Sequence, residues 1–269
     1  MAYQNVLYGT NGNIATVTMN RPDHLNALSV ELQQDIFAAV KEASADDAIK
    51  VIILKGAGRA FCAGFDVSAA QMPLRSSRTI IQDLERLRVV DDRLLAIRDI
   101  PKPVIAQIHG YCLAGGTMLA AMCDLAVVSE ECRIGSIKAP LGAGFVASMW
   151  VWLVGARKTK ELFYTIGNTV SGVEAAQIGW ATKAVPADKL EAEVNVLASG
   201  IAETPMELLK LYKLQINRIE DIMGYRTAIM SGCDTDAIAH FGAANKAFEV
   251  LVKEKGLKQA LASWRDVIK

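Results

Sequence analysis

Two short stretches decide the fold of this chain: Phe61-Cys62-Ala63-Gly64-Phe65-Asp66-Val67 and His109-Gly110-Tyr111-Cys112-Leu113-Ala114-Gly115-Gly116. Each stretch follows an apolar run that is typical of a buried strand, and each leads toward a helical pattern. A chain that passes from strand to helix in this way can aim a backbone N–H group at a fixed point. Two such donors aimed at one point form an oxyanion hole, which stabilises negative charge on a carbonyl oxygen without an acidic side chain.

Strand and helix patterns alternate around these two stretches. Apolar runs of the strand type occupy residues 14–19, 51–54, 103–108 and 125–128. Helical periodicity covers residues 29–40 and 78–98. Ser29 is expected to cap the first of these helices, and Pro101 to end the second. This β–α–β order predicts parallel strands with crossover helices, and no Gly-x-Gly-x-x-Gly sequence follows the first strand as a Rossmann fold would require.

The second half of the chain is predicted to be mostly helical. Residues 171–179 are expected to form a short capped helix, and residues 180–185 a strand. From about residue 188 onward the pattern is helical, and Pro205 separates one helix from the next. The chain is therefore predicted to have an α/β core at residues 1–205 and a C-terminal helical region at residues 206–269.

The composition of the 269 residues excludes several classes of protein. Lys and Arg together number 29, as do Asp and Glu, and no block of like charge occurs, which argues against nucleic acid as a partner. No apolar run reaches the roughly 18–20 residues of a membrane span, and the N-terminus lacks the pattern of a signal peptide. The five cysteines show no metal-ligand spacing, which favours reduced thiols in a cytoplasmic protein that holds no metal.

Four pieces of the sequence, in order, resemble the fingerprints of the crotonase superfamily, also called the enoyl-CoA hydratase/isomerase family. They are Asn20-Arg21-Pro22 with Asn26-Ala27-Leu28, then Phe61–Val67, then Pro103–Ala106 through Gly115-Gly116 to Cys123-Asp124, and finally Gly167-Asn168 with Ala175-Ala176 and Gly179. The similarity covers nearly the whole chain. It implies a spiral ββα core, a helical trimerisation region, and an acyl-CoA ligand whose coenzyme A is part of the substrate, with no separate cofactor.

The resemblance also implies where the site lies. By position, it places the two oxyanion donors on the backbone N–H groups of Phe65 and Gly115. Gly115 is expected at a helix N-terminus, where the helix dipole favours the developing anion. The backbone of five further residues is implied to line the groove for coenzyme A: Leu25, Ala27, Ala63, Asp66 and Val67.

Three positions depart from the family pattern. Hydratases of the family use two glutamates to position a water and move its proton, and here Met118 and Lys138 stand at those positions. Methionine has no proton to give, and a lysine accepts one at pH 7 only where burial lowers its pKa. Val146 stands where the dehalogenase branch of the family places a nucleophilic aspartate. We expect Met118 and Val146 in the wall of the acyl pocket, and Lys138 as the candidate catalytic side chain.

Other side chains are weaker candidates. Asp91 lies where the dehalogenase branch has a catalytic histidine, but Asp91-Asp92-Arg93 is interpreted as a solvated helix face. His109 is expected to be a hydrogen-bonded structural residue, and His240 to lie at the surface or at a subunit interface. Trp150 is expected either in an apolar wall near the acyl pocket or in the core.

The apolar residues of the C-terminal helices point to an assembly. They occur on more than one face, at Leu208, Leu211, Leu214, Ile222, Ile229, Phe241, Phe248 and Leu251. One α/β core cannot readily bury all of them, so we expect a homotrimer or a dimer of trimers.

Two functions remain open at the level of the sequence. The first is an enzyme that acts on an acyl-CoA thioester through an enolate or oxyanion. Hydration by two glutamates is disfavoured, which leaves isomerisation, decarboxylation, C–C cleavage or thioester hydrolysis. The second is a non-catalytic protein of the same fold that binds acyl-CoA, which the loss of both glutamates favours.

Overall fold

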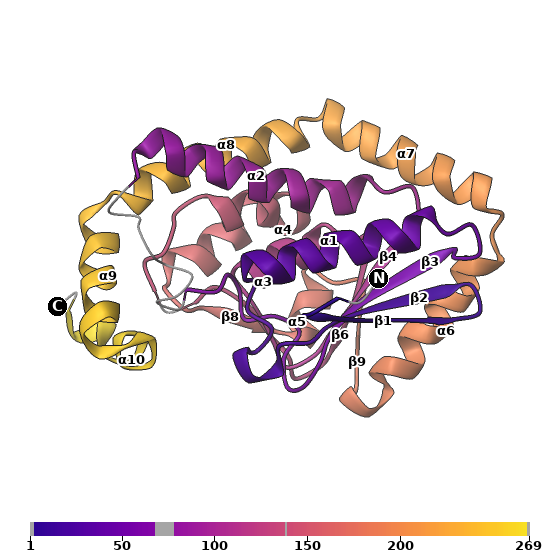
Figure 1. The fold of residues 1–269 in the computed structure, drawn as a ribbon, viewed down its shortest axis with the longest axis horizontal. Coiled ribbons are helices and arrows are strands. Elements are labelled where there is room, and N and C mark those ends of the chain that lie inside the picture. The colour runs from indigo at the N-terminus through magenta and orange to yellow at the C-terminus, as the bar shows by residue number, and fades with distance from the viewer. Residues whose placement is uncertain (1–2, 68–77, 138, 268–269) are drawn as a thin grey trace.

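The computed structural model describes residues 3–67, 78–137 and 139–267 (Figure 1). Among these residues, six strands form one sheet in the order β1-β2-β3-β4-β6-β9. The strands are β1 (Val6–Asn11), β2 (Ile14–Met19), β3 (Val51–Gly56), β4 (Val104–Ile108), β6 (Leu125–Ser129) and β9 (Lys183–Val185). Neighbouring strands are parallel except for β1 and β2. The α/β core with parallel strands that the β–α–β order predicts is confirmed.

The strand expected at residues 180–185 is shorter than predicted, because its first part belongs to the turn after a helix. The N–H groups of Trp180 and Ala181 donate to the carbonyl of Ala175, at 2.9 and 3.0 Å. These bonds close the end of α5 (Gly172–Gln177) and leave only Lys183–Val185 to pair with β6.

A second, smaller sheet consists of β5 (Tyr111–Leu113), β7 (Arg133–Gly135) and β8 (Thr169–Ser171). The sequence patterns do not predict it, because strands of three residues are too short to show a period. The sheet matters for the site, since β5 leads through Ala114 into α3 (Gly115–Ala121).

Helices cover both faces of the large sheet. The main core lies against α1 (Val30–Ala45), α2 (Ile80–Asp99), α3, α4 (Phe145–Tyr164) and α8 (Tyr225–His240), and the second core against α6 (Leu190–Glu203). In β3, Ile52 and Leu54 belong to the main core, whereas Val51 and Ile53 belong to the second one. A strand buried on both faces reads as a continuous apolar run, which is why β3 could be predicted. The predicted cap is also present, since Ser29 Oγ accepts a hydrogen bond from the Leu32 N–H at 3.2 Å.

The C-terminal region is helical, as predicted. It consists of α7 (Met206–Ile222), α8, α9 (Ala243–Lys255) and α10 (Leu257–Val267). Earlier in the described part of the chain, short 3-10 turns lie at Pro22–His24 and Ala187–Lys189. α8 packs against α2 and α4, whereas α9 and α10 form their own cluster around Phe248 and Trp264 (Figure 1). The division of the chain at residue 205 stays a prediction.

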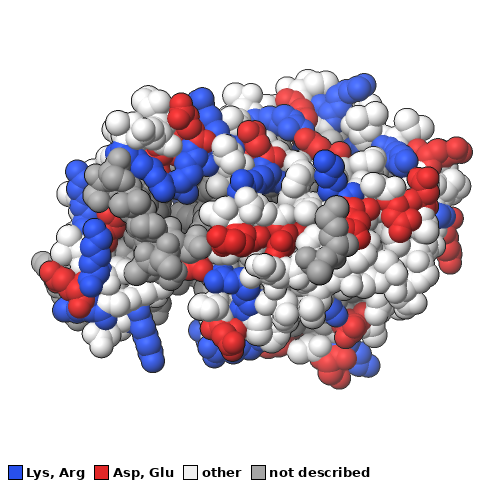
Figure 2. All heavy atoms as spheres, in the orientation of Figure 1, with Lys and Arg blue, Asp and Glu red and all other residues white. Residues whose placement is uncertain are grey.

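The surface shows no dominant charge on the face seen in Figure 2, where basic and acidic side chains are interspersed. Within the described ranges, every helix is too short or too polar to cross a membrane. All five cysteines are free thiols, as expected from their number and context.

Candidate active site

The two glycine-bearing stretches lie side by side. Residue Cys62 pairs with Cys112 in an isolated parallel bridge, in which the Cys62 N–H donates to Tyr111 O at 3.0 Å and the Leu113 N–H to Cys62 O at 2.9 Å. This pairing brings Gly64 against the start of α3. A Cβ atom on Gly64 would lie 3.4 Å from the backbone nitrogen of Gly115.

Three glycines make this close approach possible. Gly64 has a φ of +106°, which favours glycine. A Cβ atom on Gly115 would lie 2.8 Å from two ring carbons of Phe65, and one on Gly116 would lie 2.5 Å from Cys62 O. The backbones of the two stretches therefore meet without room for a side chain between them.

The backbone N–H groups of Phe65 and Gly115 take no part in the hydrogen bonds of this pairing. Within the described residues, neither of them donates to a protein acceptor, whereas their neighbours do. The Asp66 N–H donates to Leu28 O at 3.1 Å, and the Ala114 N–H to Gly135 O at 2.8 Å. Gly115 is the first residue of α3, where backbone N–H groups have no partner within the helix. Both N–H groups are thus free to receive an acceptor, and their role as oxyanion donors stays a prediction.

Ala114 carries backbone strain beside this point. Its φ of 45° and ψ of −117° lie outside the usual regions for a residue with a Cβ atom. Its carbonyl accepts hydrogen bonds from the Thr117 N–H at 2.9 Å and from the Thr117 hydroxyl at 2.7 Å. The buried Trp150 indole in turn donates to the Thr117 hydroxyl at 3.1 Å. Trp150 also stacks on Trp180, so of its two expected positions the core is confirmed.

A second pair of segments holds the predicted groove for coenzyme A. The Ala63 N–H donates to Leu25 O at 3.0 Å, and Arg21 both donates to Ala27 O at 2.6 Å and pairs with Asp66 at 3.0 Å. These contacts bring Leu25, Ala27, Ala63 and Asp66 together. Their role toward coenzyme A stays a prediction.

Asn26 supports this groove, and the prediction did not include it. Leu25 and Asn26 both have left-handed backbone, with φ values of 50° and 53°. The fully buried Asn26 side chain accepts from the Arg21 N–H at 2.9 Å and donates to Ala57 O and Ala60 O at 2.9 and 2.8 Å. An asparagine followed by Ala-Leu at the end of a turn was the available signal, because asparagine tolerates this backbone and can replace turn hydrogen bonds with its side chain.

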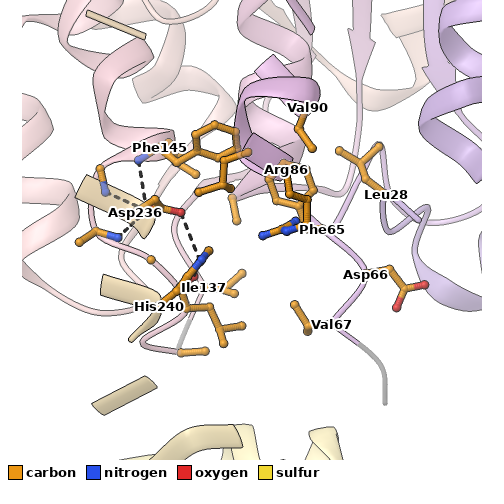
Figure 3. Close-up of a pocket in the computed structure, with 18 of the residues that line it drawn as sticks. Leu28, Phe65, Asp66, Val67, Arg86, Val90, Ile137, Phe145, Asp236 and His240 are labelled. Atoms are coloured by element: carbon orange, nitrogen blue, oxygen red, sulfur yellow. Dashed lines mark hydrogen bonds and ion pairs between the residues drawn. The ribbon is translucent and has the colours of Figure 1, made fainter. Parts of the chain in front are cut away.

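A cavity of about 480 Å³ opens next to the glycine-bearing stretches. In Figure 3, Phe65, Arg86 and Val90 lie on one side of it, and Asp236 and His240 on the opposite side. Asp66, Val67 and Val146 also line the cavity. Val146 therefore lies in the wall of this cavity, and its role in an acyl pocket stays a prediction.

The two positions of the missing glutamates differ from each other. Met118 is fully buried in the main core and is not among the residues that line the cavity, because the side chain of this α3 residue packs inward among other core residues. Lys138 lies outside the described residues. Its chain neighbours Ile137 and Ala139 both line the cavity.

Asp91 is not on a solvated helix face, so that interpretation is wrong. Its side chain is fully buried because α8 covers this side of α2, and Cys233 Sγ donates to Asp91 Oδ2 at 2.9 Å. Burial raises the pKa of the Asp91 carboxyl to about 7. Asp91 is not among the cavity-lining residues, so it meets Cys233 rather than a ligand.

His240 is buried within the chain, which corrects the expected position at the surface or between subunits. Its Nδ1 lies 2.5 Å from Asp83 Oδ2, and its Nε2 lies 3.1 Å from Leu141 O. Burial alone would raise the pKa of Asp83, but the hydrogen bond with His240 and the charge of Arg86 outweigh it and lower this pKa to about 2. Both ring nitrogens of His240 have protein partners, so the ring joins α8 to α2 and to the loop before α4.

Asp236 lies one turn before His240 on α8 and was also missed. Its Oδ1 accepts hydrogen bonds from the N–H groups of Ala143, Gly144 and Phe145, at 2.7, 3.0 and 3.3 Å. It therefore caps the start of α4 from another helix. The available signal was the i, i+4 spacing of Asp236 and His240, which places both side chains on the same face of α8. His109 is structural as expected, since its Nε2 lies 2.8 Å from Gly58 O.

Comparisons with known proteins agree with this geometry. The family model described as enoyl-CoA hydratase/isomerase matches residues 9–234. A Rhizobium meliloti protein named "Probable enoyl-CoA hydratase" is 32% identical over 228 residues, which cover 81% of this chain and 83% of that protein. A crystal structure of an enoyl-CoA hydratase/isomerase from Xanthobacter autotrophicus Py2 has a TM-score of 0.92 at 33% identity and covers 100% of this chain and 99% of that one. A crystal structure of enoyl-CoA hydratase from Mycobacterium smegmatis has a TM-score of 0.89 at 27% identity. The match covers 98% of this chain and 94% of that one.

Proposed function

Because the chain belongs to the enoyl-CoA hydratase/isomerase family, we propose that it is an enzyme that acts on an acyl-CoA thioester. The observation that carries the proposal is the contact between Gly64-Phe65 and Gly115, beside a cavity of about 480 Å³. The N–H groups of Phe65 and Gly115 would bind the thioester oxygen and stabilise the negative charge that an enolate or tetrahedral oxyanion places on it. The segments around Leu25 and Ala63 would hold coenzyme A.

The reaction is proposed to differ from hydration by two glutamates, although the relatives named above are hydratases by name. Methionine at position 118 cannot position or deprotonate a water, and its burial in the core supports a packing role. Isomerisation, decarboxylation, C–C cleavage and thioester hydrolysis remain, and each needs a group that moves a proton or holds a charge. Lys138 is proposed for this role, because the residues on both sides of it line the cavity. The free cysteines support a reducing, cytoplasmic location.

A second candidate is a non-catalytic protein that binds acyl-CoA. The observation that favours it is that titratable side chains of the cavity wall are already bonded within the protein. Among the described residues of that wall, Asp236 is engaged by three backbone N–H groups, and both ring nitrogens of His240 are occupied. These two groups are therefore already engaged in contacts within the protein, and the case for catalysis depends on Lys138 and on the backbone donors.

One experiment separates the two candidates. The protein is incubated with a panel of CoA thioesters that includes crotonyl-CoA, and the products are followed by mass spectrometry. Turnover of any thioester supports the enzyme, whereas micromolar binding of coenzyme A without turnover supports the second candidate. Hydration of crotonyl-CoA is expected to be several orders of magnitude slower than in an ordinary hydratase, since each acid–base group contributes about 100- to 10,000-fold. A rate in the hundreds per second would contradict the assignment of positions 118 and 138.

A further inference from the structure

Three arginines line the cavity from the side of α2. Arg78 precedes the helix, and Arg86 and Arg93 lie on it, seven residues apart and thus on the same face. Three cations are unusual in the wall of a pocket for an apolar acyl group, because a charged side chain loses hydration when such a group covers it.

The acidic groups of the wall, Asp66 and Asp236, are already engaged elsewhere, and so is Asp83, which pairs with two of the arginines from outside the wall. Asp83 Oδ1 lies 3.1 Å from Arg86 and 3.7 Å from Arg78, while its Oδ2 binds His240. Asp66 pairs with Arg21 at 3.0 Å, and Asp236 accepts three backbone N–H groups. One buried carboxylate is therefore shared by two arginines and a histidine, which leaves the wall with excess positive charge.

Arg93 forms no ion pair with another described residue. Its side chain is half-buried, and no hydrogen bond or ion pair to another described residue joins it. Residues 68–77 and Lys138, which the structure does not describe, contain neither aspartate nor glutamate in their sequence. A half-buried guanidinium is stabilised by an anion, and its planar group is well matched to a carboxylate.

The surroundings of Arg93 indicate which part of a CoA thioester this anion belongs to. Arg93 lines the main cavity and also a small adjoining pocket, whose other residues are mostly apolar and include Leu28, Phe65 and Leu119. Phe65 carries one of the proposed oxyanion donors, so Arg93 lies on the side of the reacting acyl group. The phosphates of coenzyme A are strongly hydrated and are poorly suited to such an apolar pocket.

We propose that the substrate is a CoA monothioester of a dicarboxylic acid, and that Arg93 binds the free carboxylate of its acyl group. This inference rests on the proposed function. Arg86 and Arg78, which share Asp83, add positive potential at the same wall. The carboxylate would fix the register of the acyl chain and hold its thioester carbonyl at the two backbone donors.

Isothermal titration with three ligands tests the proposal: coenzyme A, pentanoyl-CoA and glutaryl-CoA, the last two being close in length and different in charge. The wild-type protein is expected to bind glutaryl-CoA at least about 10-fold more tightly than pentanoyl-CoA. Arg93→Met should weaken glutaryl-CoA about 10- to 100-fold, the range of a charged hydrogen bond, and leave the other two ligands within about 3-fold. Arg93→Lys should restore part of the loss. Arg88→Met is the matched control, because Arg88 lies on the same helix but pairs with Asp234 at the surface.

The outcomes are distinguishable. Equal affinity of the wild-type protein for pentanoyl-CoA and glutaryl-CoA would overturn the inference and leave the proposed function standing. An equal loss for all three ligands in Arg93→Met would place a phosphate of coenzyme A on Arg93 and would also overturn it. Failure of all three ligands to bind the wild-type protein would overturn the proposed function, and the inference with it. Thermal unfolding of Arg93→Met confirms that the variant is folded.

Discussion

At the scale of single residues, Gly115 lies in close contact with Phe65, which carries the other proposed donor. Gly115→Ala would place a methyl group 2.8 Å from two ring carbons of Phe65, so the ring and one of the two donors must move. We expect kcat/KM on any thioester that is turned over to fall about 100- to 1,000-fold, as for the loss of one oxyanion donor. Gly200→Ala is the control, because a Cβ atom there meets nothing within 4 Å. Unchanged kinetics in Gly115→Ala would mean that the thioester carbonyl does not bind at the N–H groups of Phe65 and Gly115.

Lys138 carries the second prediction at this scale. Lys138→Met removes the charge and keeps most of the volume, so a chemical role should be lost while the shape of the pocket is kept. We expect kcat/KM to fall at least about 100-fold, which corresponds to about 2.7 kcal/mol of transition-state stabilisation. Steady-state kinetics would measure this fall in kcat/KM, with Lys160→Met, at an exposed lysine, as the control. A change confined to KM would mean that the lysine only binds the acyl group.

At the scale of elements, the contact between α2 and α8 contains a buried carboxyl. Asp91 titrates near pH 4 in an unfolded chain and near pH 7 in the folded one. Between these values the folded chain binds the extra proton, so this residue makes the protein less stable as the pH rises. From pH 5 to pH 8 we expect Asp91→Asn to gain about 2–3 kcal/mol in free energy of unfolding relative to the wild-type protein.

Urea unfolding at several pH values measures this gain. Asp92→Asn is the matched control, because Asp92 is exposed on the same turn of α2 and should follow the wild-type curve. Parallel pH profiles for Asp91→Asn and the wild-type protein would show that Asp91 is ionised in its buried position.

The elements also show what the sequence could predict. The strands at residues 14–19 and 51–54 were predictable because burial on one or both faces leaves a period or an apolar run in the sequence itself. The burial of Asp91 was not predictable from the sequence, because it depends on contact with Cys233, which lies 142 residues further along the chain. The same holds for His240, whose partner Asp83 belongs to a distant helix. In the candidate site, the close approach of the two glycine-bearing stretches was predictable from backbone motifs, whereas the direction of the Met118 side chain depends on the packing of α3.

At the scale of the whole molecule, α7 presents large apolar side chains to solvent. Ile229, Phe248 and Leu251 are buried within the chain, but Leu211 and Ile222 on α7 are 60% and 80% exposed. A patch of this kind on one helix is typical of a protein interface. We therefore expect a homotrimer, or a dimer of trimers, at micromolar concentration in light scattering.

Ile222→Glu is expected to shift this assembly toward monomers, because a charge would be buried in the interface. Val196→Glu on α6 is the control, since Val196 is also exposed, at 71%, but lies on another helix. A wild-type protein that remains monomeric at micromolar concentration would contradict the prediction and leave the apolar face of α7 unexplained.

The absence of room beside Gly64, Gly115 and Gly116 has a consequence for how such a protein can diverge. In the proposed function, the carbonyl is bound by backbone N–H groups, and a side chain added at these glycines would crowd neighbouring atoms of the fold. The proposed chemistry depends instead on side chains such as those at positions 93, 138 and 146, which are separate from the glycines that bring the two backbone donors together. New reactions can therefore arise by replacing a few wall residues, and a library restricted to those positions would explore them while the scaffold stays intact.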